Sequence, residues 1–374
     1  MPLNPMPLLR RAVALAALLP LCAAAQQPAL ALLPVGPGYI TGLSDDGLAA
    51  TGQLYADYQT FRWSLRDGLQ PLGRGTFSTL SIISGMPAIS GDGKTIGSTV
   101  LDDSGSVATF GRWTVQGGWQ QLAPPLPPGG GVMDQQDSGV FGMSRNGQVV
   151  TGLFWRPGQS GGSAHGTVWT AATQMVDMGS DGYSSRIDGA SADGSVLAGW
   201  DEHPSYGTRR AAVWVNGVKT ILDPSDWPSE AAAVNGAGTL IVGQSADPAN
   251  NYRETATLWA WDGSQWQRRF LGVVPDSRAN SVSYASGLSD DGRIIVGSAR
   301  RNASKPTSVG FVWTEADGMM DAMDYLKARG HDLHRKLDVF SVPRVTPDGR
   351  SLAINGTLPR PPYAVQSLIA RQRQ

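Results

Sequence analysis

The sequence predicts an all-β fold, a seven-bladed β-propeller whose blades each have four strands. A short motif occurs seven times and combines a small polar residue, Asp-Gly or a close variant, an aliphatic pair and a glycine. The first residues of successive motifs lie 46, 54, 47, 44, 54 and 57 residues apart. A tryptophan follows six of the motifs at an equivalent place. A period of roughly 40 to 50 residues with loops of variable length is typical of four-stranded propeller blades.

The motifs begin at Ser44, Ser90, Ser144, Ser191, Asn235, Ser289 and Thr346. Each predicts a two-residue turn between the first and second strands of a blade, because Asp-Gly and Asn-Gly tolerate the positive φ of such a hairpin. The motif that begins at Asn235 lacks the Asp and keeps its final Gly238.

The sixth repeat shows the strands of one blade most clearly. We expect a first strand over 282–288 and a second over 293–297, whose mostly apolar residues indicate burial on both faces. A polar stretch leads to a third strand over 309–314, and the outer strand begins at Met319. The other repeats follow the same order.

The recurrent tryptophans lie on the predicted third strands. They are Trp63, Trp113, Trp169, Trp214, Trp259 and Trp313. We expect them to pack between neighbouring blades, where each buries on the order of 200 Å². A ring of sugar-stacking platforms is the alternative, and the apolar neighbours of these residues favour packing.

The two ends of the chain predict how the ring closes. The segment 30–34 has the pattern of an outer strand, and 363–369 has that of a third strand with nothing after it. The N-terminal segment would then complete the last blade and remove an open sheet edge. The one clear helical signal runs from Met320 to Arg329, stops at Gly330 and lies between the sixth and seventh motifs.

The N-terminus has the pattern of a secretory signal peptide over residues 1–25. Arg10 and Arg11 precede an apolar stretch, and small residues at 23–25 form a cleavage site. We expect a mature chain that begins at Gln26 and lies in the periplasm or outside the cell. The apolar stretch is too short to span a bilayer, so no membrane span is expected. Cys22, the single cysteine, would leave with the signal peptide, which excludes disulfides and Cys-ligated metals.

Composition narrows the function further. The net charge is −1 with 16% charged residues, which gives no basic face for nucleic acid. The 47 glycines and 25 prolines lie mainly between apolar runs and so indicate turns. We expect one domain over 26–374, and a monomer.

The motif and the strands after it resemble the HAF-type extracellular repeat family of bacterial proteins. That family's pattern is close to Ser-x-Asp-Gly-x-x-Val-Val-Gly, then Ala-Phe-x-Trp-Thr and Gly-Met-x-x-Leu-Gly. Residues 44–52 with 60–64 and 68–73 match it, as do 289–297 with 310–314. The resemblance covers nearly the whole mature chain and implies secretion and a propeller-like array. It implies no activity and no catalytic residues.

Two patterns have the spacing of catalytic or metal sites. Residues 158–162 fit the nucleophile elbow of a serine hydrolase, with His165 nearby, but an elbow needs a strand before it and a helix after it. A Pro at 157 and further Gly and Ser residues favour a loop instead. His331 and His334 form a pair without a third metal ligand, which favours a surface role.

Three acid pairs are candidates for calcium ligands or glycosidase carboxylates. They are Asp45-Asp46, Asp102-Asp103 and Asp290-Asp291. Two of them lie in the predicted turns, where backbone geometry already explains an Asp. We therefore expect no cofactor and no catalytic residue, with bound Ca²⁺ as the alternative.

The loops between second and third strands point to a binding surface. In a propeller these loops lie on the face opposite the Asp-Gly turns, and here they vary in length and hold aromatic and Arg residues. Such side chains on a rigid scaffold are typical of binding sites. The expected ligand-binding residues are Tyr55, Tyr58, Trp155, Trp200, His203, Tyr206, Arg209, Tyr252, Arg253 and Arg300.

The sequence thus favours a secreted binding or interaction module for a glycan or an envelope or extracellular protein. We expect that replacing Trp200 and Tyr206 removes ligand binding without lowering stability. One alternative is a polysaccharide-active hydrolase or lyase that uses acids with a Tyr or His at the central channel. The other is a structural surface or matrix protein.

Overall fold

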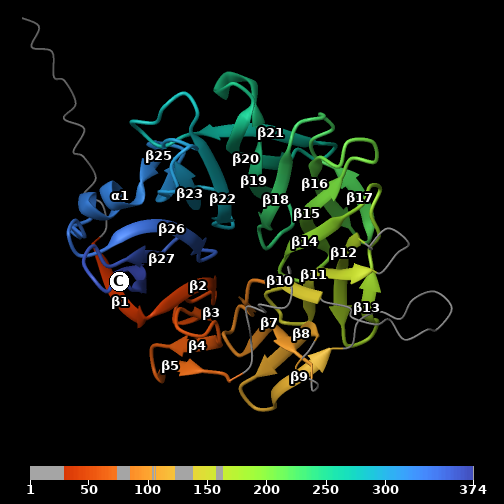
Figure 1. Cartoon of the computed structure of the whole chain (residues 1–374), viewed down its shortest axis with the longest axis horizontal. Coiled ribbons are helices and arrows are strands. Elements are labelled where there is room, and N and C mark those ends of the chain that lie inside the picture. The colour runs from red at the N-terminus through yellow and green to blue at the C-terminus, as the bar shows by residue number, and fades with distance from the viewer. Residues whose placement is uncertain are drawn as a thin grey trace, which may run out of the picture.

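The structure is a ring of seven antiparallel sheets with four strands each (Figure 1). It is a computed structural model, which describes residues 29–73, 85–102, 105, 107–122, 138–156 and 163–373. The predicted signal peptide and the segment 158–162 lie outside these residues, and so does Asp103. The predicted seven-bladed propeller is confirmed.

The first three blades follow one another in chain order, each from the innermost strand outward. Blade 1 comprises β2 (Gly38–Leu43), β3 (Ala49–Leu54), β4 (Thr60–Ser64) and β5 (Gly68–Pro71). Blade 2 comprises β6 (Ala88–Ile89), β7 (Thr95–Leu101), β8 (Ala108–Thr114) and β9 (Gly118–Leu122). Blade 3 comprises β10 (Ser138–Met143), β11 (Val149–Arg156), β12 (Ser163–Thr170) and β13 (Gln174–Asp177).

The next three blades have the same strand order. Blade 4 comprises β14 (Ser185–Ala190), β15 (Val196–Glu202), β16 (Arg209–Val215) and β17 (Val218–Ile221). Blade 5 comprises β18 (Ser229–Val234), β19 (Leu240–Asp247), β20 (Arg253–Trp261) and β21 (Trp266–Gly272), with a short 3₁₀ helix at Pro248–Asn250. Blade 6 comprises β22 (Val282–Leu288), β23 (Ile294–Arg300), β24 (Val309–Thr314) and β25 (Gly318–Asp321).

The seventh blade closes the ring with strands from both ends of the chain. Its inner strands are β26 (Asp338–Val345), β27 (Ser351–Thr357) and β28 (Val365–Gln372), and its outer strand is β1 (Leu30–Gly36). β1 pairs antiparallel with β28, with Leu33 opposite Ile369. The closure by the N-terminal segment is confirmed, and it pairs the edge that β28 would otherwise expose.

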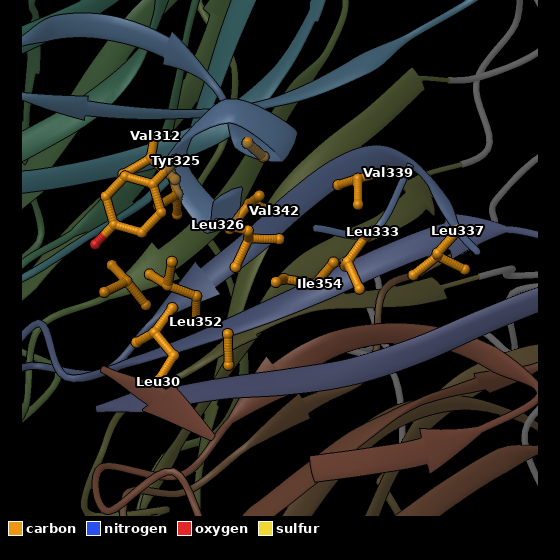
Figure 2. Packing of buried hydrophobic residues seen from close by; sticks show 14 residues of the cluster. Leu30, Val312, Tyr325, Leu326, Leu333, Leu337, Val339, Val342, Leu352 and Ile354 are labelled. Atoms are coloured by element: carbon orange, nitrogen blue, oxygen red, sulfur yellow. The ribbon is translucent and has the colours of Figure 1, made fainter. Parts of the chain in front are cut away.

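A buried cluster ties the closing strand to its neighbours. It joins Leu30 of β1 to Val312 of blade 6, Ile354 of blade 7, and Tyr325 and Leu326 of the helix α1 (Ala322–Ala328) (Figure 2). The helix therefore covers the seam between blades 6 and 7.

The helix begins two residues later than predicted. Met320 still belongs to β25, where it pairs with Val312. The Asp321 side chain then accepts a hydrogen bond of 2.7 Å from the Met323 N–H and caps the helix. The strand pairing and the cap together fix this boundary.

The recurrent tryptophans pack between blades, as expected. Trp63, Trp169, Trp214, Trp259 and Trp313 are at most 4% exposed, while Trp113 is partly buried. Trp259 of blade 5, for example, shares a cluster with Val196 and Val213 of blade 4. This burial leaves those five rings no open face for a sugar.

The motif turns differ from the predicted two-residue hairpin. In the first motif the Ser44 N–H donates to the Ala49 carbonyl at 2.9 Å, so four residues form the loop. Of these four residues, only Gly47 has a positive φ, +67°. Asp46 is instead selected by its side chain, which accepts hydrogen bonds from the Ser44 hydroxyl at 2.7 Å and the Leu48 N–H at 2.8 Å.

The same contact from hydroxyl to side chain recurs around the ring. It joins Ser90 to Asp92, Ser144 to Asn146, Ser191 to Asp193, Ser289 to Asp291 and Thr346 to Asp348. The second residues of neighbouring motifs also hydrogen-bond through the backbone, for instance Asp45 N–H to the Gly91 carbonyl at 2.9 Å. We call the face with these motifs the turn face and the opposite one the loop face.

No helix in the described residues is long and apolar enough to cross a membrane.

Candidate functional site

The loop face has a pocket of about 500 Å³ between blades 3 and 4. Three of the residues expected from sequence line it, namely Trp155, Trp200 and Arg209. Arg186 and Glu202 line it as well. A concave site with aromatic walls and a few convergent polar groups is the ordinary form of a ligand pocket. We call it the loop-face pocket.

Strand register brings these side chains together. Arg186 on β14 pairs with Trp200 on β15, and Glu202 at the end of β15 pairs with Arg209 at the start of β16. Trp155, near the end of β11, faces them from blade 3. The strands of two blades thus hold the pocket, and no long loop is needed to form it.

Trp200 forms the floor under two guanidinium groups. The Arg209 guanidinium carbon lies 4.4 Å from the centroid of its ring, and that of Arg186 lies 5.3 Å away. Arg186 also stacks on Phe141, at 4.3 Å. Since Trp200 is only 3% exposed, it supports the arginines and offers a ligand no open aromatic face.

Acidic residues hold the two arginines from below. The Arg186 Nε donates to Asp188 Oδ1 at 2.7 Å, and the Arg209 Nη1 donates to Glu230 Oε1 at 2.5 Å. Burial raises the pKa of Asp188 to about 6, although the adjacent Arg186 opposes the rise. Burial also raises the pKa of Glu202, whose carboxylate accepts a 2.9 Å hydrogen bond from the Ser184 N–H.

Two other expected residues line a separate hollow of about 540 Å³ between blade 5 and the segment that leads to blade 6. Tyr252 stacks on Trp227 with 4.7 Å between ring centroids, and Arg253 lies beside them. This hollow shares no lining residue with the loop-face pocket.

The remaining expected residues are spread around the loop face. His203 and Tyr206 stack on each other at 4.6 Å in blade 4. In blade 1 the ring centroids of Tyr55 and Tyr39 lie 6.1 Å apart, and Tyr55 and Tyr58 are both exposed. In blade 6, Arg300 donates a 3.3 Å hydrogen bond to the Tyr284 hydroxyl. The structure therefore does not bring the expected residues into one site.

Sequence reasoning missed the residues that come from the innermost strands. Arg186 and Asp188 lie on β14, and Phe141 lies on β10, whereas the expectation considered loops alone. The available signal was the charge itself. An Arg and an Asp two residues apart in a strand of otherwise small and apolar residues indicate a buried ion pair.

Three histidines that the sequence patterns singled out, His165, His331 and His334, have local partners. His165 Nδ1 lies 2.8 Å from Asp177 Oδ1, and His334 Nδ1 lies 2.7 Å from Asp332 Oδ1. His331 Nε2 lies 2.7 Å from the Leu30 carbonyl oxygen, so His331 and His334 make different contacts. Within the described residues no three His, Cys, Asp or Glu side chains are grouped to hold a metal ion.

A smaller cavity of about 130 Å³ lies on the axis of the ring. The innermost strands of all seven blades line it, mainly with glycine, alanine and aliphatic residues. Its charged residues are Asp188 and Arg344 within the ring and Asp45 and Arg145 at the turn face. No Tyr or His is among the described residues that line it, whereas the hydrolase or lyase alternative requires one there.

Comparisons with known proteins identify the fold and no family. No family model matches the chain, and no curated protein gives a significant match. The β-propeller domain of Cps50 (Swd1) from Myceliophteria thermophila aligns with a TM-score of 0.50 and 10% identity, covering 89% of this chain and 96% of that one. Puromycin hydrolase aligns with a TM-score of 0.58 and 12% identity, covering 90% of this chain and 53% of that one.

The chain also matches TolB from Acinetobacter baumannii, with a TM-score of 0.41 and 15% identity. That alignment covers 63% of this chain and spans 56% of the TolB chain. The alignments with TM-scores of 0.50 and 0.58 show the propeller fold, and at 10% and 12% identity they leave the ligand undetermined.

Proposed function

We propose that this protein is an exported binding module that presents its loop-face pocket to a glycan. The observation that carries the proposal is the convergence of Trp155, Arg186, Glu202 and Arg209 on one pocket between two rigid blades. Aromatic and aliphatic walls suit the apolar face of a sugar ring, and the charged groups suit its hydroxyls. The signal-peptide pattern at residues 1–25 supports export to the periplasm or the cell exterior.

An envelope or extracellular protein is the other ligand that this pocket suits, because Trp and Arg side chains are enriched among the residues that anchor protein interfaces. A screen of a glycan array and of an envelope extract separates the two ligands. The ligand that is eluted is then checked for chemical change, since a cleaved product would indicate an enzyme in place of a binding module.

The decisive variant is Trp155→Ala, which removes one wall of the pocket. The matched control is Trp261→Ala, because Trp261 is 42% exposed at the end of β20 that reaches the turn face. We expect Trp155→Ala to lower affinity for the captured ligand about tenfold or more. Equal binding by both folded variants would overturn the proposal.

A further inference from the structure

The arginines of the loop-face pocket have hydrogen-bond donors to spare. Among the described residues, Arg186 donates only through Nε, to Asp188, and its Nη2 lies 3.6 Å from Glu230 Oε2. Arg209 donates only through Nη1, to Glu230. A guanidinium carries five N–H donors, so most donors of this pair are available to a ligand.

The surroundings keep these guanidinium groups in place. Arg186 is 18% exposed and lies between the rings of Phe141 and Trp200. The Arg209 guanidinium carbon lies 4.4 Å from the centroid of the Trp200 ring. Stacking on a ring leaves the donors at the edge of the guanidinium plane free for in-plane acceptors. Arg209 is 47% exposed, so the entropic cost of ordering is met before a ligand binds mainly for Arg186.

The chemistry of these donors selects a particular acceptor. A guanidinium fork matches the two oxygens of a carboxylate, and a charge-assisted pair of this kind is roughly twice as strong as a neutral hydrogen bond. A neutral sugar offers single hydroxyls, which satisfy such a fork less well. Both arginines and Glu202 line the pocket, while the carboxylates that pair with the arginines, Asp188 and Glu230, are not among its lining residues.

We propose that the loop-face pocket binds a uronate, an acidic sugar whose carboxylate is held by Arg186 and Arg209. The pyranose ring of the uronate lies against Trp155, and Glu202 accepts from its hydroxyls. This inference rests on the proposed glycan-binding function and names the class of sugar. It involves no covalent step.

The test is a calorimetric titration of the purified protein with trigalacturonate and trimannuronate and with their carboxyl-reduced counterparts. We expect at least one uronate trimer to bind about tenfold or more tightly than its reduced form. Arg209→Gln should lower affinity for that trimer to the level of the reduced form. Arg186→Lys, which keeps the charge but loses the fork, should do so in part.

The control is Arg269→Gln. Arg269 is 52% exposed, lies 5.2 Å from the Trp313 ring centroid and donates to Glu315 at 2.6 Å, so it reproduces the environment of Arg209 outside the pocket. This variant should bind the uronate trimer as the wild type does.

Two failures are distinguishable. If neither uronate trimer binds, or if both bind no better than their reduced forms, the uronate inference is overturned. If binding of the ligand captured from the array or the extract still depends on Trp155, the proposed binding function stands without the uronate inference. If no captured ligand depends on Trp155, the binding function itself fails.

Discussion

Arg145 donates hydrogen bonds of 2.7 and 2.5 Å to the two carboxylate oxygens of Asp290, across the turn-face mouth of the ring. Both residues occupy the second position of their motifs, in blades 3 and 6. Asp45, at the same position in blade 1, lies 3.8 Å from the Arg145 Nε. Equivalent positions of the repeat have thus diverged in charge, and the ring brings them together.

Loss of Arg145 should destabilise the ring. Burial by itself would raise the pKa of the Asp290 carboxyl. The hydrogen bonds from Arg145 and the Gly236 N–H outweigh this effect and hold that pKa below its usual range. Arg145→Leu leaves the carboxylates of Asp290 and Asp45 without a counter-charge, and we expect a loss of about 1–2 kcal/mol in the free energy of unfolding at pH 7, measured in urea.

The control is Arg350→Leu, because the exposed Arg350 lies 3.8 Å from Asp348 on the same face and should contribute less than about 0.5 kcal/mol. Because the folded-state pKa of Asp290 is depressed, its contribution is present above the unfolded-state pKa and is lost as the pH falls through the folded-state pKa. The cost of Arg145→Leu should therefore shrink in acid. Equal losses for the two variants at pH 7 would contradict this role.

Asp188 should make stability depend on pH in the opposite direction. Its pKa rises from 3.8 to about 6 on folding, so the folded state binds the proton more tightly. The resulting stability is fully present below pH 3.8 and is lost as the pH rises through about 6, with an upper limit of about 3 kcal/mol. Asp188→Asn should remove this decline, as followed by urea unfolding between pH 4 and 7.

A matched control lies in the same blade. The pKa of Asp193 is lowered to about 2, chiefly by hydrogen bonds from the backbone and side chain of Ser195. Asp193→Asn should keep the decline in stability between pH 4 and 7, because Asp188 is unchanged. A wild-type protein without any such decline would show that Asp188 does not retain its proton near pH 6.

Leu30 should contribute strongly to closure of the ring. Its side chain is 2% exposed and packs in the cluster that joins β1, α1 and blades 6 and 7 (Figure 2). Leu30→Ala should lower the free energy of unfolding by about 2–4 kcal/mol, through lost burial and a residual cavity. The control Leu65→Ala, at a side chain with 55% exposure, should cost less than about 0.5 kcal/mol by thermal or urea unfolding.

Trp200 and Tyr206 should separate a structural residue from a surface residue. Because Trp200 is 3% exposed under two arginines, Trp200→Ala should cost about 3–5 kcal/mol in the free energy of unfolding. Tyr206 is 67% exposed, and Tyr206→Ala should change stability by less than about 0.5 kcal/mol. From the sequence alone, the double variant Trp200→Ala with Tyr206→Ala is expected to keep its stability. Because Trp200 is buried, the structure predicts that this variant is less stable than the wild type. Equal melting temperatures for the two single variants would contradict this.

The number of blades, the order of their strands and the closure of the ring could all be predicted from the amino-acid sequence. These features depend on local chemistry that repeats. The Ser44 hydroxyl bonded to Asp46 and the positive φ of Gly47 shape a turn within a few residues. The glycine recurs in all seven motifs, and the hydroxyl contact recurs in all but that of blade 5. The strands of each repeat are apolar, and a ring of blades buries them because each blade packs against its two neighbours.

The contacts between charged and aromatic residues depend instead on how the blades pack in the closed ring. Arg145 and Asp290 are 145 residues apart, and Arg186 meets Phe141 and Arg209 meets Trp200 only because blades and strands pack in a particular rotation. A sequence shows that a strand carries an Arg, but the partner of that Arg is set by the register of its neighbours and the twist between blades. Those are properties of the closed ring, so the face of the pocket and three of its residues, Trp155, Trp200 and Arg209, could be predicted, whereas Arg186 on the innermost strand could not.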